Sequence, residues 1–329
     1  MNIINLFLIF SVFSSLWSVG GRTIKLDKLD DSAFPAYACR LDLVAKTITM
    51  DDGKLTTKDL SFPCTSIVIE KKEKELKLLT AAHCLVNLDI NDFGDKVYYH
   101  HSIPKVIRCP NRIDGKKVFY ADYRIQDYSF LYDKRFLEEK ASIIAFDRYG
   151  DKKETGDLSL RDFEDNIIKP LGKLKVNEEE YRNLALKVAS LDLAVLTVRT
   201  DKSTYLIEQA SMPESISKVE NCMIAGYSKK KKLNAGEVSN LSVHKSFLDK
   251  MGYISANRKD QKSWVDFGDS GGPLFCEQKD GSWAVVGVTS NFDSILSRPT
   301  MFWSIADKAV VNRMIKSSDD QVVKINKKK

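Results

Sequence analysis

The chain has 329 residues, of which 43% are hydrophobic, and a formal net charge of +6 at pH 7. A chain of this size and composition can bury one large core or two small ones. It contains no visible internal repeat and no long Pro/Gly linker, which excludes repeat architectures and loosely linked domains. Lysine runs occur at 229–232 and in a basic tail at 319–329. Because such runs are usually solvated, we expect no nucleic-acid partner.

The N-terminus is typical of a targeting segment. The run 6–17 is almost wholly apolar, and the small residues Ser18, Gly20 and Gly21 follow it, so residues 1–21 are expected to be a signal peptide with an uncertain cleavage point. The run is short for a membrane span. Residues 1–5 contain no lysine or arginine, which leaves a retained anchor as the alternative. We expect a secreted, periplasmic or extracellular protein with no membrane contact once the signal is removed.

Most of the remaining pattern predicts strands. Apolar or alternating runs predict strands at 36–43, 66–69, 76–79, 142–146, 193–198, 222–225 and 284–290. Apolar residues at helical spacing predict a C-terminal helix at 305–315. Two further helices are predicted at 162–168 and 178–186.

Two polar residues stand beside apolar, strand-like runs. His83, one of only four histidines, follows the run 78–82 in a turn of small residues and precedes Cys84. Asp192 opens the hydrophobic run 193–198. An imidazole can exchange a proton near neutral pH, and a carboxylate can orient it. Each of these residues alone is more often structural or solvated, so whether they are catalytic depends on a third group.

The third group is Ser270, in the sequence Gly-Asp-Ser-Gly-Gly-Pro at 268–273, which we call the Ser270 turn. Glycines allow backbone conformations closed to other residues, so N–H groups can converge where a negatively charged oxygen forms. A hydroxyl is a poor nucleophile and needs an adjacent base. A tight connection between strands is the alternative, but His83, Asp192 and Ser270 together indicate nucleophilic catalysis.

These segments resemble those of the trypsin/chymotrypsin-like serine endopeptidase family. The match is residue by residue at 80–84, 192–196 and 268–273, and weaker at 222–227 and 286–290. The resemblance implies an all-β fold of two packed six-stranded antiparallel β-barrels of the chymotrypsin type, with a C-terminal helix.

The resemblance also divides the chain. It implies a first β-barrel at 22–205 and a second β-barrel with the C-terminal helix at 206–318, before the basic tail. Asp127 rivals Asp192, because its distance from His83 along the sequence is closer to the family's usual one. We prefer Asp192, because the run behind it alternates well and leads soon to Cys222. The first barrel would then carry a long insertion at about 86–185.

Catalytic roles follow from the resemblance. Ser270 would attack the scissile carbonyl, and His83 would take its proton and return it to the leaving amine. Asp192 would hold the imidazole in the useful tautomer, with Ser290 supporting this carboxylate. The N–H groups of Gly268 and Ser270 would form the oxyanion hole.

Six cysteines and an apolar N-terminus suggest an oxidising compartment. The resemblance implies two disulfides, Cys64–Cys84 beside His83 and Cys222–Cys276 within the second barrel. Cys39 and Cys109 remain as a third pair, with buried free thiols as the alternative.

Residues at the expected specificity pocket depart from the family. Trp264 stands where trypsins have the aspartate that accepts lysine or arginine, and Asp266 replaces a family cysteine. Phe292 and Thr300 stand at or near the positions of two pocket-wall glycines. Because large side chains fill such a pocket, we expect a preference for small residues before the scissile bond.

Activation in the family pairs a newly freed N-terminus with an aspartate, here Asp269. Val19 would begin the mature chain if signal-peptide removal is the activation step, and Thr23 would begin it after a second cut behind Arg22.

The combined prediction is a secreted serine endopeptidase that uses an acyl-enzyme intermediate and is not trypsin-like in specificity. We expect protein or peptide substrates, no cofactor, no metal and a monomer. The alternative is a non-catalytic, partner-binding protein on the same fold, in which the blocked pocket and the insertion serve recognition.

Overall fold

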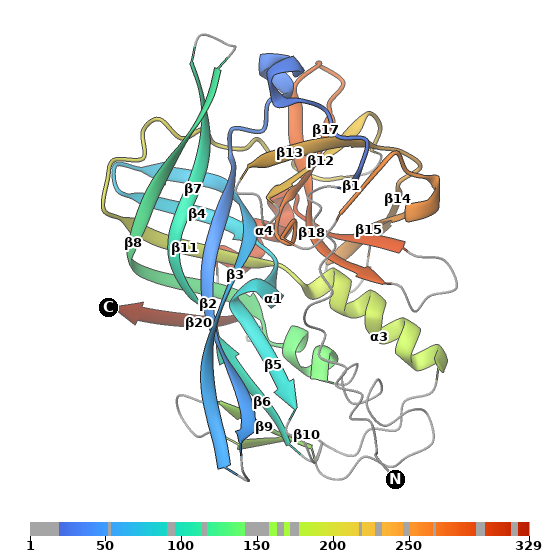
Figure 1. Cartoon of the computed structure of the whole chain (residues 1–329). Coiled ribbons are helices and arrows are strands. Elements are labelled where there is room, and N and C mark those ends of the chain that lie inside the picture. The colour runs from blue at the N-terminus through green and yellow to red at the C-terminus, as the bar shows by residue number, and fades with distance from the viewer. Residues whose placement is uncertain are drawn as a thin grey trace, which may run out of the picture.

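The computed structural model describes residues 20–51, 54–90, 96–113, 117–141, 158–162, 168–171, 178–216, 219–227, 232–245, 251–265, 268–293, 300–316 and 322–328. Strands predominate, so the predicted all-β class is confirmed. Two seven-stranded antiparallel sheets form the two halves of the body (Figure 1).

The first sheet contains a closed cycle of strands. Its order is β11 (Ala194–Thr200), β4 (Glu75–Thr80), β3 (Lys54–Lys72), β2 (Ala38–Asp51), β7 (Ile103–Ile113), β8 (Lys117–Asp133) and β20 (Val322–Lys328). Because β11 pairs with β4 on one side and with β8 on the other, the first six strands form a ring. β20 lies beside the second half of β8, so the expected basic tail contains a strand.

The expected insertion at about 86–185 needs correction. β7 and β8 fall within it, yet both belong to the ring. Neither strand forms an apolar run in the sequence, because buried residues alternate with outward-facing polar ones. In β8, for example, Tyr123 and Ile125 are buried whereas Arg124 between them is exposed. The segments between β4 and β11 that lie outside the ring therefore contain β5 (Val86–Ile90), β6 (Lys96–His101), β9 (Leu158–Asp162), β10 (Ile168–Leu171), a short helix at 135–141 and α3 (Glu178–Leu191).

The two helices predicted in this region have different outcomes. The helix at 178–186 is confirmed as α3, which continues to Leu191. The helix at 162–168 is wrong, because Asp162 ends β9 and Ile168 begins β10. The predicted strand at 142–146 lies outside the described residues.

The second sheet also has seven strands rather than the expected six. Its order is β13 (Leu233–Val238), β12 (Cys222–Tyr227), β17 (Pro273–Glu277), β18 (Trp283–Asp293), β19 (Thr300–Ile305), β15 (Gly252–Asn257) and β14 (Ser242–Lys245). β12 is buried throughout because β13 and β17 flank it, whereas β15 alternates between buried and half-buried residues. The strands predicted at 222–225 and 284–290 are confirmed.

One apolar core joins the two sheets. The Tyr227 hydroxyl of β12 donates to the Ala38 carbonyl of β2 at 3.3 Å, and the rings of Tyr37 and Phe275 meet edge to face with centroids 6.4 Å apart. The predicted C-terminal helix is α4 (Lys308–Lys316), which buries one apolar face. The short elements are β1 (Gly20–Gly21), η1 (Leu26–Lys28), η2 (Asp31–Ala33), α1 (Ala82–Leu85), η3 (Arg258–Asp260) and β16 (Ser263–Trp264).

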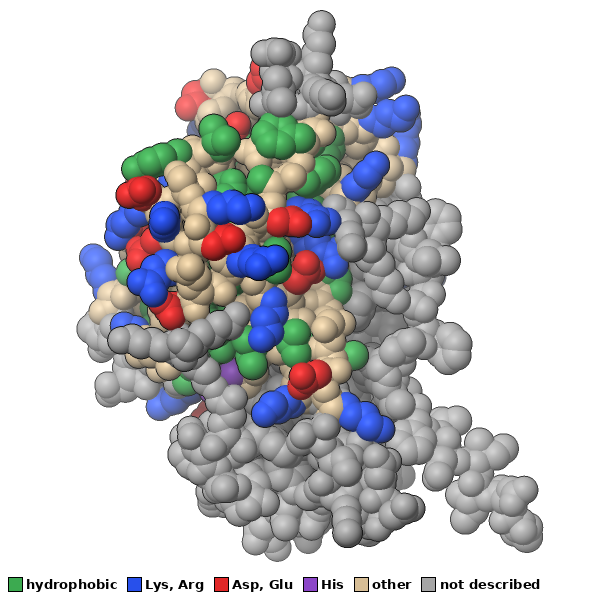
Figure 2. Space-filling model, turned by 60° about the vertical axis from the view of Figure 1, so that its left-hand side comes forward, with side chains coloured by type: hydrophobic (Ala, Val, Ile, Leu, Met, Phe, Trp, Pro, Cys, Tyr) green, Lys and Arg blue, Asp and Glu red, His purple; other side chains and the backbone are tan. Residues whose placement is uncertain are grey.

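The surface over the first sheet carries charges of both signs. Figure 2 shows Lys and Arg side chains interspersed with Asp and Glu, rather than gathered into one basic patch on this face. Within the described ranges, no helix has both the length and the apolar character needed to cross a bilayer.

Candidate active site

His83 lies in α1, a single helical turn at the end of β4. The turn fits because Ala81 and Ala82 are small and fully buried. Cys84, the next residue, is bonded to Cys64 with an S–S distance of 2.04 Å, which fixes the turn to β3. The side chain of His83 is 31% exposed, so one edge of the imidazole remains accessible.

Asp192 connects α3 to β11, and its side chain is almost fully buried. Its Oδ1 accepts a hydrogen bond from the backbone N–H of His83 at 2.9 Å, and its Oδ2 lies 2.7 Å from His83 Nδ1. The Ser290 hydroxyl donates to the same Oδ2 at 2.6 Å. The carboxylate therefore has three partners, and the expected neighbours His83, Asp192 and Ser290 are brought together.

The surroundings of Asp192 favour the charged form of its carboxyl. Burial on its own raises the pKa of Asp192, but the charge of His83 and the hydrogen bonds from His83 and Ser290 outweigh it, so the pKa lies below its ordinary value. A charged Asp192 can only accept hydrogen bonds, so the proton between it and His83 lies on Nδ1. The other ring nitrogen, Nε2, is then free to act as a base.

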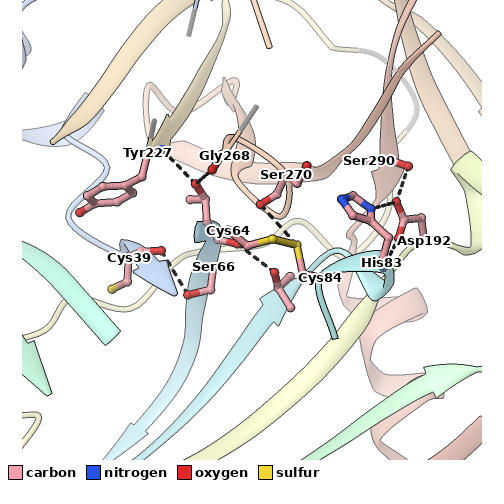
Figure 3. Close-up of a disulfide and its surroundings, with 12 residues drawn as sticks. Cys39, Cys64, Ser66, His83, Cys84, Asp192, Tyr227, Gly268, Ser270 and Ser290 are labelled. Atoms are coloured by element: carbon pink, nitrogen blue, oxygen red, sulfur yellow. Dashed lines mark hydrogen bonds and ion pairs between the residues drawn. A yellow bond between two sulfur atoms is a disulfide. The ribbon is translucent and has the colours of Figure 1, made fainter. Parts of the chain in front are cut away.

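The Ser270 turn lies beside these residues in the second half of the chain. Figure 3 shows the imidazole of His83 between the carboxylate of Asp192 and the Ser270 turn. Ser270 is half-buried, and its carbonyl oxygen lies 3.8 Å from the sulfur of Cys84. Ser270 and His83 are thus both partly exposed, whereas the carboxylate of Asp192 is buried.

Glycine is required at two positions of this turn. Gly268 has φ 99° and Gly271 has φ 82°, values that favour glycine. A Cβ on Gly271 would also lie 2.1 Å from the Thr65 carbonyl oxygen and 2.2 Å from Thr80 Oγ1. The Ser270 turn can therefore pack directly on β3 and β4 only because Gly271 lacks a side chain.

All three expected cysteine pairs are disulfides. Cys222–Cys276 joins directly opposite residues of β12 and β17 and so anchors the strand that follows the Ser270 turn. Cys39–Cys109 joins β2 and β7. Among the described residues there is no free cysteine.

The rival Asp127 has a different partner. It stands opposite Arg199 where β8 pairs with β11, and the two side chains form an ion pair. Asp192, in contrast, contacts both the backbone and the ring of His83. This geometry favours Asp192 as the acid beside the base.

Asp269 and the N-terminal segment both contact strands of the second sheet. Asp269 is 1% exposed, and it packs so closely on Gly226 that a Cβ there would lie 2.2 Å from its Oδ1. Val19 lies outside the described residues, but β1, which follows it, pairs with β16. Arg22 and Thr23 are exposed. The choice between the two mature termini therefore stays a prediction.

The expected pocket residues converge on β19. Phe292 stands opposite Met301, whose sulfur accepts a hydrogen bond from the N–H of Val265 at 3.3 Å. Trp264 precedes Val265 and is half-buried, as is Thr300 at the start of β19. The three segments are thus adjacent, while Asp266 lies outside the described residues.

Two residues with contacts to this site were missed by the sequence analysis. Thr65 contacts the Ser270 turn, and the Ser304 hydroxyl lies 2.8 Å from the Ala189 carbonyl oxygen and 3.0 Å from that of Asp192. These contacts join residues more than a hundred positions apart. Local sequence pattern therefore holds no signal that could have found them.

The family model described as Trypsin matches residues 163–305. The matched stretch contains Asp192, Ser270 and Ser290, and the match agrees with the family resemblance of the motifs. His83 lies outside the matched stretch.

Among solved structures, the chain is similar to a Glu endopeptidase in complex with MPD, with a TM-score of 0.43 and 12% identity over 91% of this chain and 97% of that one. It is also similar to neuropsin, a serine protease expressed in the limbic system of mouse brain, with a TM-score of 0.39 and 15% identity over 90% of this chain and 98% of that one. No curated protein matches the chain.

Proposed function

We propose that the chain is a secreted serine endopeptidase that hydrolyses peptide bonds through an acyl-enzyme intermediate. The observation that carries the proposal is the hydrogen-bonded chain from Ser290 through Asp192 to His83, which ends beside Ser270 in its glycine-rich turn. A binding protein has no need for a buried, fully bonded carboxylate behind an accessible imidazole.

The proposed mechanism assigns one step to each group. His83 Nε2 accepts the proton of Ser270 Oγ as this oxygen attacks the scissile carbonyl, and a C–O bond forms. The N–H groups of Gly268 and Ser270 stabilise the oxyanion. Protonated His83 then donates to the leaving amine as the C–N bond breaks, and water hydrolyses the ester in the same way. Asp192 stays charged throughout and stabilises the imidazolium.

Labelling with a fluorophosphonate tests this proposal. The properly processed protein should be labelled, and Ser270→Ala should abolish labelling while leaving the circular dichroism spectrum unchanged. If the folded, processed wild-type protein takes up no label, the alternative of a non-catalytic binding protein replaces this proposal.

We propose that the protein does not cleave peptide bonds that follow lysine or arginine. The guanidinium carbon of Arg258 lies 4.8 Å from the centroid of the Trp264 ring, so a cation already occupies one side of that residue. A substrate lysine or arginine beside Trp264 would meet a like charge, and Phe292 stands where the family's open pockets have glycine. Cleavage of a peptide library should show small residues at this position, whereas strong preference for lysine or arginine would contradict the assignment.

Secretion and processing belong to the same proposal. Three disulfides, each with a buried cysteine, favour an oxidising compartment. N-terminal sequencing of the mature protein distinguishes Val19 from Thr23 as its first residue. Either result would supply the free α-amino group that pairing with Asp269 requires, and any other terminus would remove this activation mechanism.

A further inference from the structure

We infer that Thr65 is a positioning residue, whose hydroxyl holds the Ser270 turn in the form that binds a negatively charged oxygen. Thr65 lies in β3 of the first sheet, next to Cys64, and is fully buried. The Ser270 turn lies in the second half of the chain, so the contact crosses from one sheet to the other. The inference rests on the proposed function.

The hydroxyl of Thr65 is fully engaged. Its oxygen accepts a hydrogen bond from the backbone N–H of Tyr227 at 3.0 Å, and it donates to the carbonyl of Gly268 at 2.9 Å. Because a backbone N–H can only donate, the single hydroxyl proton must point to Gly268. Figure 3 labels Tyr227 and Gly268, the two partners of this hydroxyl.

The backbone of Thr65 holds the other side of the turn. Its N–H donates to the carbonyl of Ser270 at 2.7 Å, and its own carbonyl accepts from the Thr80 hydroxyl at 2.8 Å. Between the two anchored carbonyls, the carbonyl of Asp269 accepts from the N–H of Gly272 at 2.8 Å. Three successive carbonyls of the turn therefore have partners inside the protein.

This restraint matters for the chemistry proposed above. Gly268 at φ 99° can adopt many other conformations, because glycine has no Cβ to confine it. A rotation of its backbone would turn away the N–H group that faces the oxyanion or turn a carbonyl dipole toward it. With Gly268 and Ser270 both tied to Thr65, the N–H groups on either side keep fixed directions, as preorganised stabilisation of charge requires.

Two variants measure the contribution of the Thr65 hydroxyl separately from that of its methyl group. Thr65→Val keeps the shape and removes the hydroxyl, whereas Thr65→Ser keeps the hydroxyl and removes the methyl. Thr200→Val is the matched control, because Thr200 is also fully buried and its hydroxyl contacts two backbone carbonyls, those of Lys74 and Lys202. The readouts are the rate of fluorophosphonate labelling, and kcat and KM on a peptide from the library.

We expect Thr65→Val to lower kcat and the labelling rate by about 10- to 100-fold with KM changed less than about threefold, because the loss falls on the transition state. Thr65→Ser and Thr200→Val should both stay within about threefold of wild type. Activity of Thr65→Val equal to that of Thr200→Val would overturn the inference. If Thr65→Val does not fold, Thr65→Ser decides: retained activity supports the hydroxyl, and a loss of tenfold or more in the folded protein overturns it.

The two proposals fail in different ways. Absence of labelling in the folded, processed wild-type protein contradicts the proposed function. Labelling of wild type together with full labelling of Thr65→Val contradicts only the role of Thr65.

Discussion

Replacing Ser290 by alanine should destabilise the protein in a manner that depends on pH. Ser290 is buried, and its hydroxyl donates to the charged, buried carboxylate of Asp192 at 2.6 Å. A hydrogen bond to a charged group contributes about 1.5–3 kcal/mol. At neutral pH, we therefore expect the free energy of unfolding to fall by that amount, measured by urea denaturation.

The sign of the pH effect follows from the pKa of Asp192. This pKa lies below its ordinary value in the folded protein, so the carboxylate contributes stability above the unfolded-state pKa and loses it as pH falls through the folded-state pKa. Ser290→Ala removes one of the hydrogen bonds that lower this pKa. The difference between the variant and wild type should therefore be largest at neutral pH and should shrink at acidic pH, as the pH falls through the folded-state pKa of Asp192 in the variant and then through the lower one in wild type.

Ser66→Ala provides the control for this experiment. Ser66 is also fully buried, but its hydroxyl donates to the neutral carbonyl of Cys39 at 3.2 Å. We expect a smaller loss of about 0.5–1.5 kcal/mol that does not change with pH. Parallel pH curves for the two variants would refute the assignment of Ser290 as a support of charged Asp192.

Three further predictions follow from the same contacts. Asp192→Asn should lower kcat by about 10⁴-fold, because the amide no longer holds the useful tautomer of His83, whereas Asp127→Asn should leave kcat within about twofold because this carboxylate pairs with Arg199. Ser304→Ala should lower the free energy of unfolding by about 1–3 kcal/mol in urea denaturation, since two buried carbonyls share its hydroxyl. The double replacement of Cys222 and Cys276 by serine should lower the same free energy by about 2–5 kcal/mol.

The candidate site was predictable where its chemistry is concentrated in short segments. His83 follows a buried strand in a turn of small residues, and Ser270 lies between glycines, because these local conformations require those residue types. Asp192 was identified from the run behind it and from Cys222, although Asp127 had the more usual spacing. The structure supports that choice through geometry the sequence does not contain, since Asp127 is paired with Arg199.

The parts that sequence analysis did not predict depend on distant partners. β7 and β8 were assigned to an insertion because each has one polar face, and only their pairing with β2 and β11 places them in the ring. β20 was expected as a solvated tail because it is rich in lysine. Yet Ile325, between the exposed residues Lys324 and Asn326, packs against the core while the strand pairs with β8.

The arrangement of partners also predicts how the protein unfolds. Asp192 borders the first sheet, yet Ser290 of the second sheet holds its carboxylate. Ser270 adjoins the second sheet, yet Thr65 of the first holds its carbonyl. One apolar core, with Tyr227 bonded to β2, continues between the two sheets.

Since the sheets share this core, neither can unfold without exposing apolar surface of the other. In a urea titration of wild type, fluorophosphonate labelling, far-UV circular dichroism and tryptophan fluorescence should therefore change together in one transition. If labelling disappeared at a urea concentration where the spectrum of the strands was still unchanged, the sheets would separate first. The contacts between them would then stabilise the site without stabilising the fold.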